Sequence, residues 1–145
     1  MSTPVRIKTL EGGSIPSYES KGAVAFDIRA SEETTIPPRE LGLIPTGLVI
    51  EVPEGYALLL CARSSTPKKK SLLIPHGVGV IDRDYCGPED EIFIQYYNFS
   101  DKPVTVAADE RCAQGLLVRV GQAEFSEVDS LAAASRGGFG STGLK

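Results

Sequence analysis

The sequence of 145 residues contains no tryptophan, one methionine, one histidine and three cysteines. One histidine excludes every zinc site that needs two. Cys61, Cys86 and Cys112 lie about 25 residues apart and form none of the C-x-x-C pairs of zinc ribbons and thioredoxin-like proteins. An odd number of cysteines is typical of reduced thiols, and we expect a cytoplasmic protein.

The N-terminus lacks the apolar core of a signal peptide. No apolar run approaches the roughly 18 residues of a membrane span, so no membrane partner is expected.

Positive charge is also scarce. Fifteen Lys and Arg residues stand against nineteen Asp and Glu residues, which gives a formal net charge of −4. A general nucleic-acid-binding protein would carry a broadly basic surface, and we therefore expect no nucleic-acid partner. A small anionic ligand remains compatible with this balance, because a pocket needs only a local positive potential.

Fifteen glycines and ten prolines bound a series of short apolar runs. In 91–99, the apolar residues Ile92, Ile94 and Tyr96 alternate with the intervening positions at a period of two, which is typical of a half-buried strand. Runs at spacings of roughly 8–12 residues with turns between them predict an all-β sandwich or barrel with little helix. We expect one short helix in 66–74 and a short turn in 129–135. The predicted strands are 23–28, 47–52, 56–61, 78–81, 91–99 and 115–120.

The last ten residues, RGGFGSTGLK, differ from the rest and include four glycines. They cannot form a packed element alone, so we expect a single domain of residues 1–135 with a flexible glycine-rich arm at 136–145. Free backbone amides with Arg136, Ser141 and Thr142 could wrap phosphate oxygens, and Phe139 offers a ring for stacking. The segment is not a Walker P-loop, because no lysine directly follows Gly143 and no helix can follow.

Four further segments carry polar side chains at the ends of predicted strands. AFDIRA contains Asp27, CARSS contains a cation and two hydroxyls, GVIDRDYCG contains Asp82 and Tyr85, and RCAQ contains Gln114. Together with the C-terminal arm, these segments resemble, in order and spacing, the five motifs of the trimeric dUTPase family. The resemblance runs from about residue 25 to residue 143, and GVIDRDY and GFGSTG are its most specific parts.

This resemblance implies a β-barrel or jelly-roll-like dUTPase fold and an enzyme that cleaves dUTP to dUMP and pyrophosphate. Such an enzyme limits dUTP and supplies dUMP for thymidylate synthesis. Water would attack the α-phosphorus, with Asp82 as the general base, and the Tyr85 ring would lie under the deoxyribose. The backbone of a hairpin over 76–81 would read uracil, with His76, Gly79, Val80 and Ile81 as the contacts.

The resemblance also implies how the triphosphate is held. Arg63, Ser64, Ser65 and Gln114 would contact the phosphate chain, and Asp27 would hold waters of a Mg²⁺ ion carried by the substrate. Phe139 would cap the uracil while the arm closes over the site. A homotrimer with active sites at its subunit interfaces is expected. The remaining arm contacts would be Arg136, Gly140, Ser141 and Thr142.

Some positions depart from the family pattern. Ser65 and Asp109 stand where glycine is common, Arg136 lies closer to the phenylalanine than usual, and residues 88–90 resemble a small insertion. These departures keep open a dUTPase-like nucleotide-binding or regulatory protein without turnover. A second alternative is an enzyme resembling dCTP deaminase, which has a related fold and also carries an RSS-type segment.

Overall fold

The computed structural model describes residues 2–139, and in this range it contains eleven strands and one helix. The all-β prediction is confirmed. The helix is α1 (Thr66–Lys70). The strands are β1 (Arg6–Thr9), β2 (Phe26–Arg29), β3 (Thr34–Ile36), β4 (Leu41–Pro45), β5 (Leu48–Glu51), β6 (Tyr56–Cys61), β7 (Leu72–Leu73), β8 (Gly79–Ile81), β9 (Phe93–Asn98), β10 (Val104–Val106) and β11 (Arg111–Arg119).

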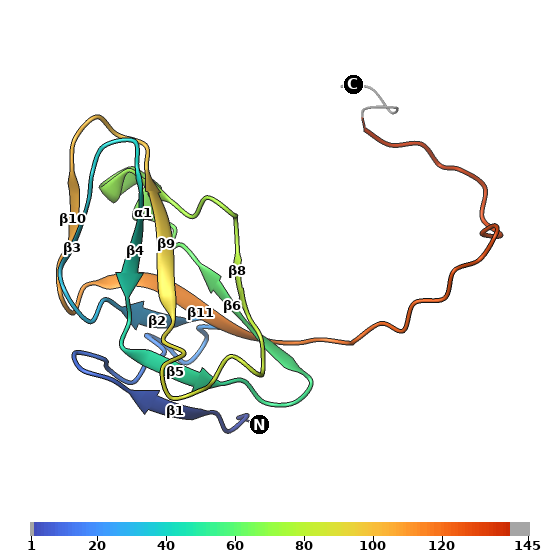
Figure 1. The fold of residues 1–145 in the computed structure, drawn as a ribbon, viewed down its shortest axis with the longest axis horizontal. Coiled ribbons are helices and arrows are strands. Elements are labelled where there is room, and N and C mark those ends of the chain that lie inside the picture. Colours follow the sequence, from blue (N-terminus) through green and yellow to red (C-terminus); the bar gives the residue numbers. More distant parts are fainter. Residues whose placement is uncertain (1, 140–145) are drawn as a thin grey trace.

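The strands form small antiparallel sheets packed around one core (Figure 1). The largest sheet has the order β2-β11-β6-β8 and a second has the order β4-β9-β7, while β1 pairs with β5 and β10 with β3. Among residues 2–139 these sheets do not close into one hydrogen-bonded barrel, so the arrangement is the jelly-roll-like form of the expected fold.

β11 is one of the two interior strands of the four-stranded sheet. It pairs with β2 on one side and with β6 on the other, so Gln114 lies opposite both Asp27 and Cys61. Three segments that are distant in the sequence therefore end at the same corner of the sheet. This register brings the predicted phosphate-binding residues together.

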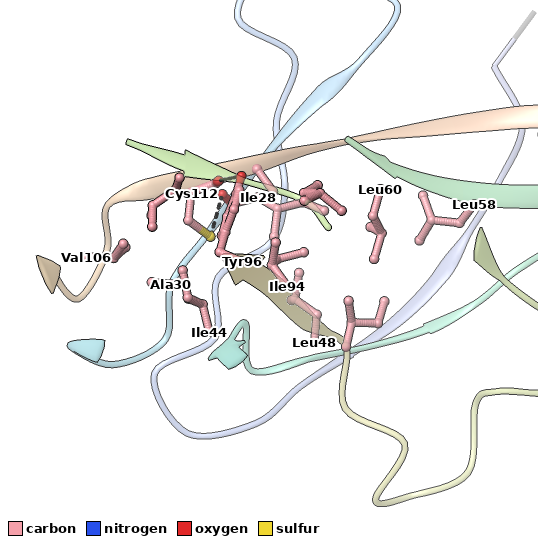
Figure 2. Packing of buried hydrophobic residues seen from close by; sticks show 14 of the residues in the cluster. Ile28, Ala30, Ile44, Leu48, Leu58, Leu60, Ile94, Tyr96, Val106 and Cys112 are labelled. Carbon is pink, nitrogen blue, oxygen red and sulfur yellow. Dashed lines mark hydrogen bonds between the residues drawn. The ribbon is translucent and has the colours of Figure 1, made fainter. Parts of the chain in front are cut away.

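The core lies between the sheets, and β9 shows how the sequence pattern builds it. Ile94, Tyr96 and Asn98 are buried while the intervening residues are not, which confirms the period of two. The Tyr96 hydroxyl donates to the carbonyl oxygen of Cys112 at 2.7 Å (Figure 2). Burial raises the pKa of Tyr96 and raises that of the Cys112 thiol to about 12, so both groups stay protonated at neutral pH.

All six predicted strands overlap observed ones, and the one short helix expected within 66–74 is α1. α1 ends at Lys70 because Ser71 adopts a left-handed conformation, with φ of 54°, and its N–H closes the helix on the carbonyl oxygen of Pro67. Leu72 and Leu73 then pair with β9 instead of continuing the helix. The predictions missed β1, β3, β4, β7 and β10.

After β11 the chain leaves the body of the protein, and residues 120–139 form no strand or helix (Figure 1). Phe125 and Leu131 in this segment are exposed. Within the described range, no helix is long and apolar enough to cross a membrane.

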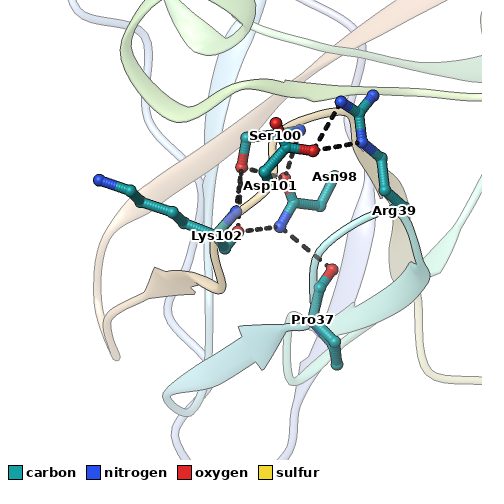
Figure 3. A network of polar contacts seen from close by, with 6 residues as sticks. All are labelled: Pro37, Arg39, Asn98, Ser100, Asp101 and Lys102. Carbon is teal, nitrogen blue, oxygen red and sulfur yellow. Dashed lines mark hydrogen bonds and ion pairs between the residues drawn. The ribbon is translucent and has the colours of Figure 1, made fainter.

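A buried side-chain amide joins two loops next to the core. Asn98 is fully buried, and its amide nitrogen donates to the carbonyl oxygens of Pro37 and Lys102 at 3.1 and 2.7 Å (Figure 3). It also donates to the carbonyl oxygen of Ile36 at 3.0 Å. Its carbonyl oxygen accepts from the backbone and hydroxyl of Ser100. One residue at the end of β9 thus ties the segment after β3 to the turn before β10.

We expect Asn98→Ala to lower the free energy of unfolding by about 3 kcal/mol, because the carbonyl oxygens of Ile36, Pro37 and Lys102 lose their amide donor at once. Urea denaturation followed by circular dichroism measures this change. Gln95→Ala, on the same strand but only half-buried, is the matched control and should cost much less. Equal losses in the two variants would contradict the role given to Asn98.

Candidate functional site

The first part of the site is a cluster of charged and polar groups where β2, β11 and β6 meet. The Arg63 Nε donates to Asp27 Oδ1 at 3.1 Å, and the Gln114 Nε2 donates to the carbonyl oxygen of Ala62 at 3.0 Å. The side chain of Asp27 is only 12% exposed, whereas that of Arg63 is 31% exposed. The terminal nitrogens of Arg63 are therefore available for an anion while Nε fixes the plane of the guanidinium.

A second arginine, which was not among the site residues predicted from the sequence, joins this cluster. The Arg111 Nη1 donates to Asp27 Oδ2 at 3.3 Å and lies 3.1 Å from Glu19 Oε2. Asp27 thus contacts one guanidinium with each carboxylate oxygen. The contact between Arg111 and Asp27 depends on the pairing of β11 with β2, so the sequence alone did not indicate it. Arg111 is nevertheless the first residue of the RCAQ segment, which also contains Gln114.

The two predicted serines lie at the start of α1, directly after Arg63. Ser64 is exposed, and Ser65 is the N-cap residue of the helix but makes no side-chain capping hydrogen bond. Both hydroxyls can therefore bind a ligand. The side chain that replaces the usual glycine at Ser65 does not stop this turn from forming, because the Ser65 carbonyl oxygen still accepts from the N–H of Lys69 at 2.8 Å.

Lysines follow these serines, and one of them is already paired. Lys70 Nζ lies 2.8 Å from Glu110 Oε1. Burial alone would raise the pKa of Glu110, but hydrogen bonds from Lys70 and from the N–H of Ala107 hold it below its usual value. Lys68 and Lys69 are exposed to solvent.

The second part of the site is a cavity of about 370 Å³ beside β8. Its lining includes all four predicted base contacts, together with Phe93 and Gln95 from β9. Among the described residues β8 pairs only with β6, so it is an edge strand whose other edge presents backbone donors and acceptors to a ligand. The predicted contacts are His76, Gly79, Val80 and Ile81.

The third part of the site is a turn directly after β8. The Tyr85 N–H donates to the carbonyl oxygen of Asp82 at 3.3 Å, which closes the turn, and the Asp82 side chain is exposed to a hollow of about 840 Å³. The Tyr85 hydroxyl donates to the carbonyl oxygen of Glu91 at 2.8 Å, which fixes the orientation of its ring. Asp82 and Tyr85 therefore lie at the two ends of one small turn.

Within one chain, this turn and the arginine cluster lie apart. Ile81 pairs with Leu58 on β6, Asp82 follows Ile81, and Arg63 lies beyond the opposite end of β6. At about 3.3 Å per residue, this register separates the Asp82 and Arg63 backbones by roughly 15–20 Å. The structure brings together Asp27, Arg63 and Gln114, and separately it places Asp82 and Tyr85 on the turn that directly follows β8, the strand that lines the base cavity.

The predicted arm contacts lie outside both groups. Arg136 and Phe139 are exposed and belong to the extended segment that leaves the body of the protein in Figure 1. The predicted contacts Gly140, Ser141 and Thr142 lie outside the described residues.

The other departures from the family pattern are accommodated locally. Asp109 has a φ of 63°, the conformation that a glycine would favour there, and its carbonyl oxygen accepts from the Arg29 Nη1 at 2.7 Å. In 88–90, the Asp90 carboxylate accepts from the N–H of Gly87 at 2.7 Å and closes a widened turn.

Comparison with solved structures defines the class of protein. The crystal structure of a dUTPase from Streptococcus mutans superposes with a TM-score of 0.77 and 32% identity, over 82% of this chain and 98% of that chain. A dUTPase of Staphylococcus bacteriophage 80alpha, solved with dUPNHPP, superposes with a TM-score of 0.88 and 25% identity, over 99% of this chain and 100% of that chain. The fold is that of the dUTPases.

Sequence comparison gives the family. The dUTPase family model matches residues 11–143. The chain is 42% identical to a deoxyuridine 5'-triphosphate nucleotidohydrolase of Bdellovibrio bacteriovorus, over 96% of this chain and 95% of that protein. It is 39% identical to the enzyme of the same name from Neisseria meningitidis, over 99% of each chain. The chain belongs to the dUTPase family, which confirms the resemblance inferred from the five motifs.

Proposed function

We propose that this protein hydrolyses dUTP to dUMP and pyrophosphate. One observation carries the proposal: Asp27, Arg63 and Gln114 meet at the ends of three neighbouring strands, where the terminal nitrogens of Arg63 have no partner among residues 2–139 and suit phosphate oxygens. Relatives about 40% identical over nearly the full chain are named deoxyuridine 5'-triphosphate nucleotidohydrolases. The substrate named for those proteins is therefore the one we propose here.

The phosphate chain binds at the arginine cluster. Asp27 holds Nε of Arg63 and leaves the terminal nitrogens to donate to phosphate oxygens. The hydroxyls of Ser64 and Ser65 and the second N–H of the Gln114 amide add neutral donors. This set suits a polyanion in a protein of net charge −4, because only the local potential must be positive.

The base and sugar bind beside β8. Free backbone groups on the outer edge of β8 pair with the donor and acceptors of uracil, and the nearby cavity has room for the ring. His76 contributes as a hairpin residue, and its Nδ1 lies 3.1 Å from the carbonyl oxygen of Val78. The Tyr85 ring, anchored through its hydroxyl, lies under the deoxyribose and leaves no room for a 2′-hydroxyl.

Asp82 is the general base. Its carboxylate accepts a proton from water as the water oxygen forms a bond to the α-phosphorus. The bond from that phosphorus to the bridging oxygen breaks, and pyrophosphate leaves with the bridging oxygen while dUMP remains. No histidine or cysteine is required, which fits a chain with one histidine in a hairpin and its least exposed thiol in the core.

Asp27 is the residue that would hold, through water, a Mg²⁺ ion carried by the triphosphate. Arg63 and Arg111 use two of roughly four acceptor positions on its carboxylate, so positions remain for water. In the described part of the chain no group of three or more His, Cys, Asp or Glu residues forms a cage, and a sparse protein contribution is usual for Mg²⁺. When bound, the ion neutralises charge on the phosphate oxygens.

A homotrimer with sites at its interfaces accounts for the separation within one chain. Asp82 must act at the α-phosphorus, next to the groups that hold the phosphates, yet in one chain it lies roughly 15–20 Å from Arg63 along β6. One copy therefore supplies the β8 half and another supplies the arginine cluster. The extended C-terminal segment provides the arm that closes the site, with Arg136 and Phe139 and the predicted contacts 140–142.

Pyrophosphate release from dUTP, UTP, dTTP and dCTP with Mg²⁺ tests the proposed function. We expect rapid release from dUTP and little from the other three, because the sugar and base contacts exclude them. Ammonia release from dCTP without pyrophosphate from dUTP would indicate a deaminase. Tight dUTP binding without any product would indicate a binding or regulatory protein.

Replacing Asp82 by asparagine tests the base. We expect Asp82→Asn to lower kcat by ~10²-fold or more while dUTP still binds, because the side chain keeps its shape but cannot accept the proton. Single-turnover hydrolysis and equilibrium binding measure the two effects. Asp84→Asn, on the same exposed turn, is the control and should keep kcat within about 3-fold. An Asp82→Asn enzyme with normal kcat would remove Asp82 from this role.

A further inference from the structure

We propose that Arg111 is a second phosphate-binding arginine and that the Glu19 carboxylate competes with the triphosphate for it. This inference rests on the proposed function, since it takes the Asp27 cluster to be the phosphate site. It assigns Arg111 to substrate binding and gives Glu19 a role in setting the affinity.

One nitrogen of Arg111 faces two carboxylates of different character. Nη1 donates to Asp27 Oδ2 at 3.3 Å and lies 3.1 Å from Glu19 Oε2. The Asp27 side chain is 12% exposed and belongs to β2, whose register against β11 is fixed, whereas the Glu19 side chain is 57% exposed and belongs to the connection before β2. The contact of Arg111 with Asp27 is therefore fixed by the pairing of β2 with β11, whereas a ligand can replace Glu19 in its contact with Arg111.

The charges in this cluster balance before a ligand arrives. Two guanidinium groups, Arg63 and Arg111, stand against two carboxylates, Asp27 and Glu19. Both guanidinium groups contact the same carboxylate, one on each oxygen, so they lie close enough to share one phosphate chain. A phosphate oxygen that replaces Glu19 keeps Arg111 paired and gives the anion a second cation.

Replacing Glu19 by a phosphate group at Arg111 is energetically favourable. An ion pair with an exposed carboxylate contributes little, because solvent screens it and a mobile side chain must be ordered. A hydrogen bond from a guanidinium to a phosphate oxygen is stronger and can be bidentate. Glu19 thus lowers the affinity for phosphates by a modest factor and still allows binding, and Asp27 acts as a positioning residue for both arginines.

Inorganic tripolyphosphate is the probe, because it lacks base and sugar and reports on the phosphate site alone. We expect Glu19→Gln to tighten its Kd by about 2- to 5-fold in calorimetry and to lower the KM for dUTP by a similar factor. Glu11→Gln is the control, since Glu11 lies in the same connection, is exposed, and pairs with no cation among residues 2–139. Unchanged tripolyphosphate affinity in Glu19→Gln would overturn the inference.

A double-mutant cycle separates competition for Arg111 from a general loss of negative charge. We expect Arg111→Gln to weaken tripolyphosphate binding about 10-fold or more and Arg111→Lys to recover part of the loss. In the Arg111→Gln background, Glu19→Gln should have no further effect, because Glu19 acts through that arginine. A Glu19→Gln effect of the same size in both backgrounds would overturn the proposal.

Failure of the proposed function and failure of this inference give different results. If the wild-type protein releases no pyrophosphate from dUTP but the cycle behaves as expected, the proposed function fails and the anion site stands. If dUTP is hydrolysed and the cycle shows no coupling, the proposed function stands and the roles of Glu19 and Arg111 are wrong.

Discussion

The carboxylate of Asp27 holds two guanidinium groups at one corner of the four-stranded sheet, and the proposed phosphate site depends on this interaction. The carboxylate is nearly buried, so it would be costly there without cationic partners. Its backbone is fixed by pairing with β11, which also carries Gln114 and Arg111. The position of Asp27 beside Gln114 and Arg111 in the proposed anion site is therefore a consequence of strand register, and the turn after β6 adds Arg63 to it.

The same register limits what one chain can do alone. β6 carries the arginine cluster at one end, while the edge strand β8 delivers Asp82 beyond the other. A rigid sheet cannot bring these ends together, so the two halves can serve one substrate only if different copies supply them. The proposed assembly follows from the length of β6, and residues 120–139 extend away from the body of the protein (Figure 1).

Local patterns in the sequence predicted the strands that build the core and failed for those that depend on distant partners. β6 was predicted with its observed bounds because its apolar residues fall between clear turns. β1 is mostly exposed and forms by pairing with β5, and β3 forms by pairing with β10, which no local pattern encodes. Among the candidate site residues, Asp27, Arg63 and Gln114 were readable from motifs. Arg111 and Glu19 were not, because their pairing depends on register and on the path of a loop.

Complementation between two inactive variants tests the central claim, that separate copies supply the two halves of each site. Asp82→Asn and Arg63→Gln chains are unfolded together, refolded as a mixture, and assayed for pyrophosphate release from dUTP, with mixed oligomers verified by native mass spectrometry. The account predicts activity well above that of either variant refolded alone, because some sites then combine an intact Asp82 with an intact Arg63. Mixed oligomers that are no more active than the separate variants would contradict it.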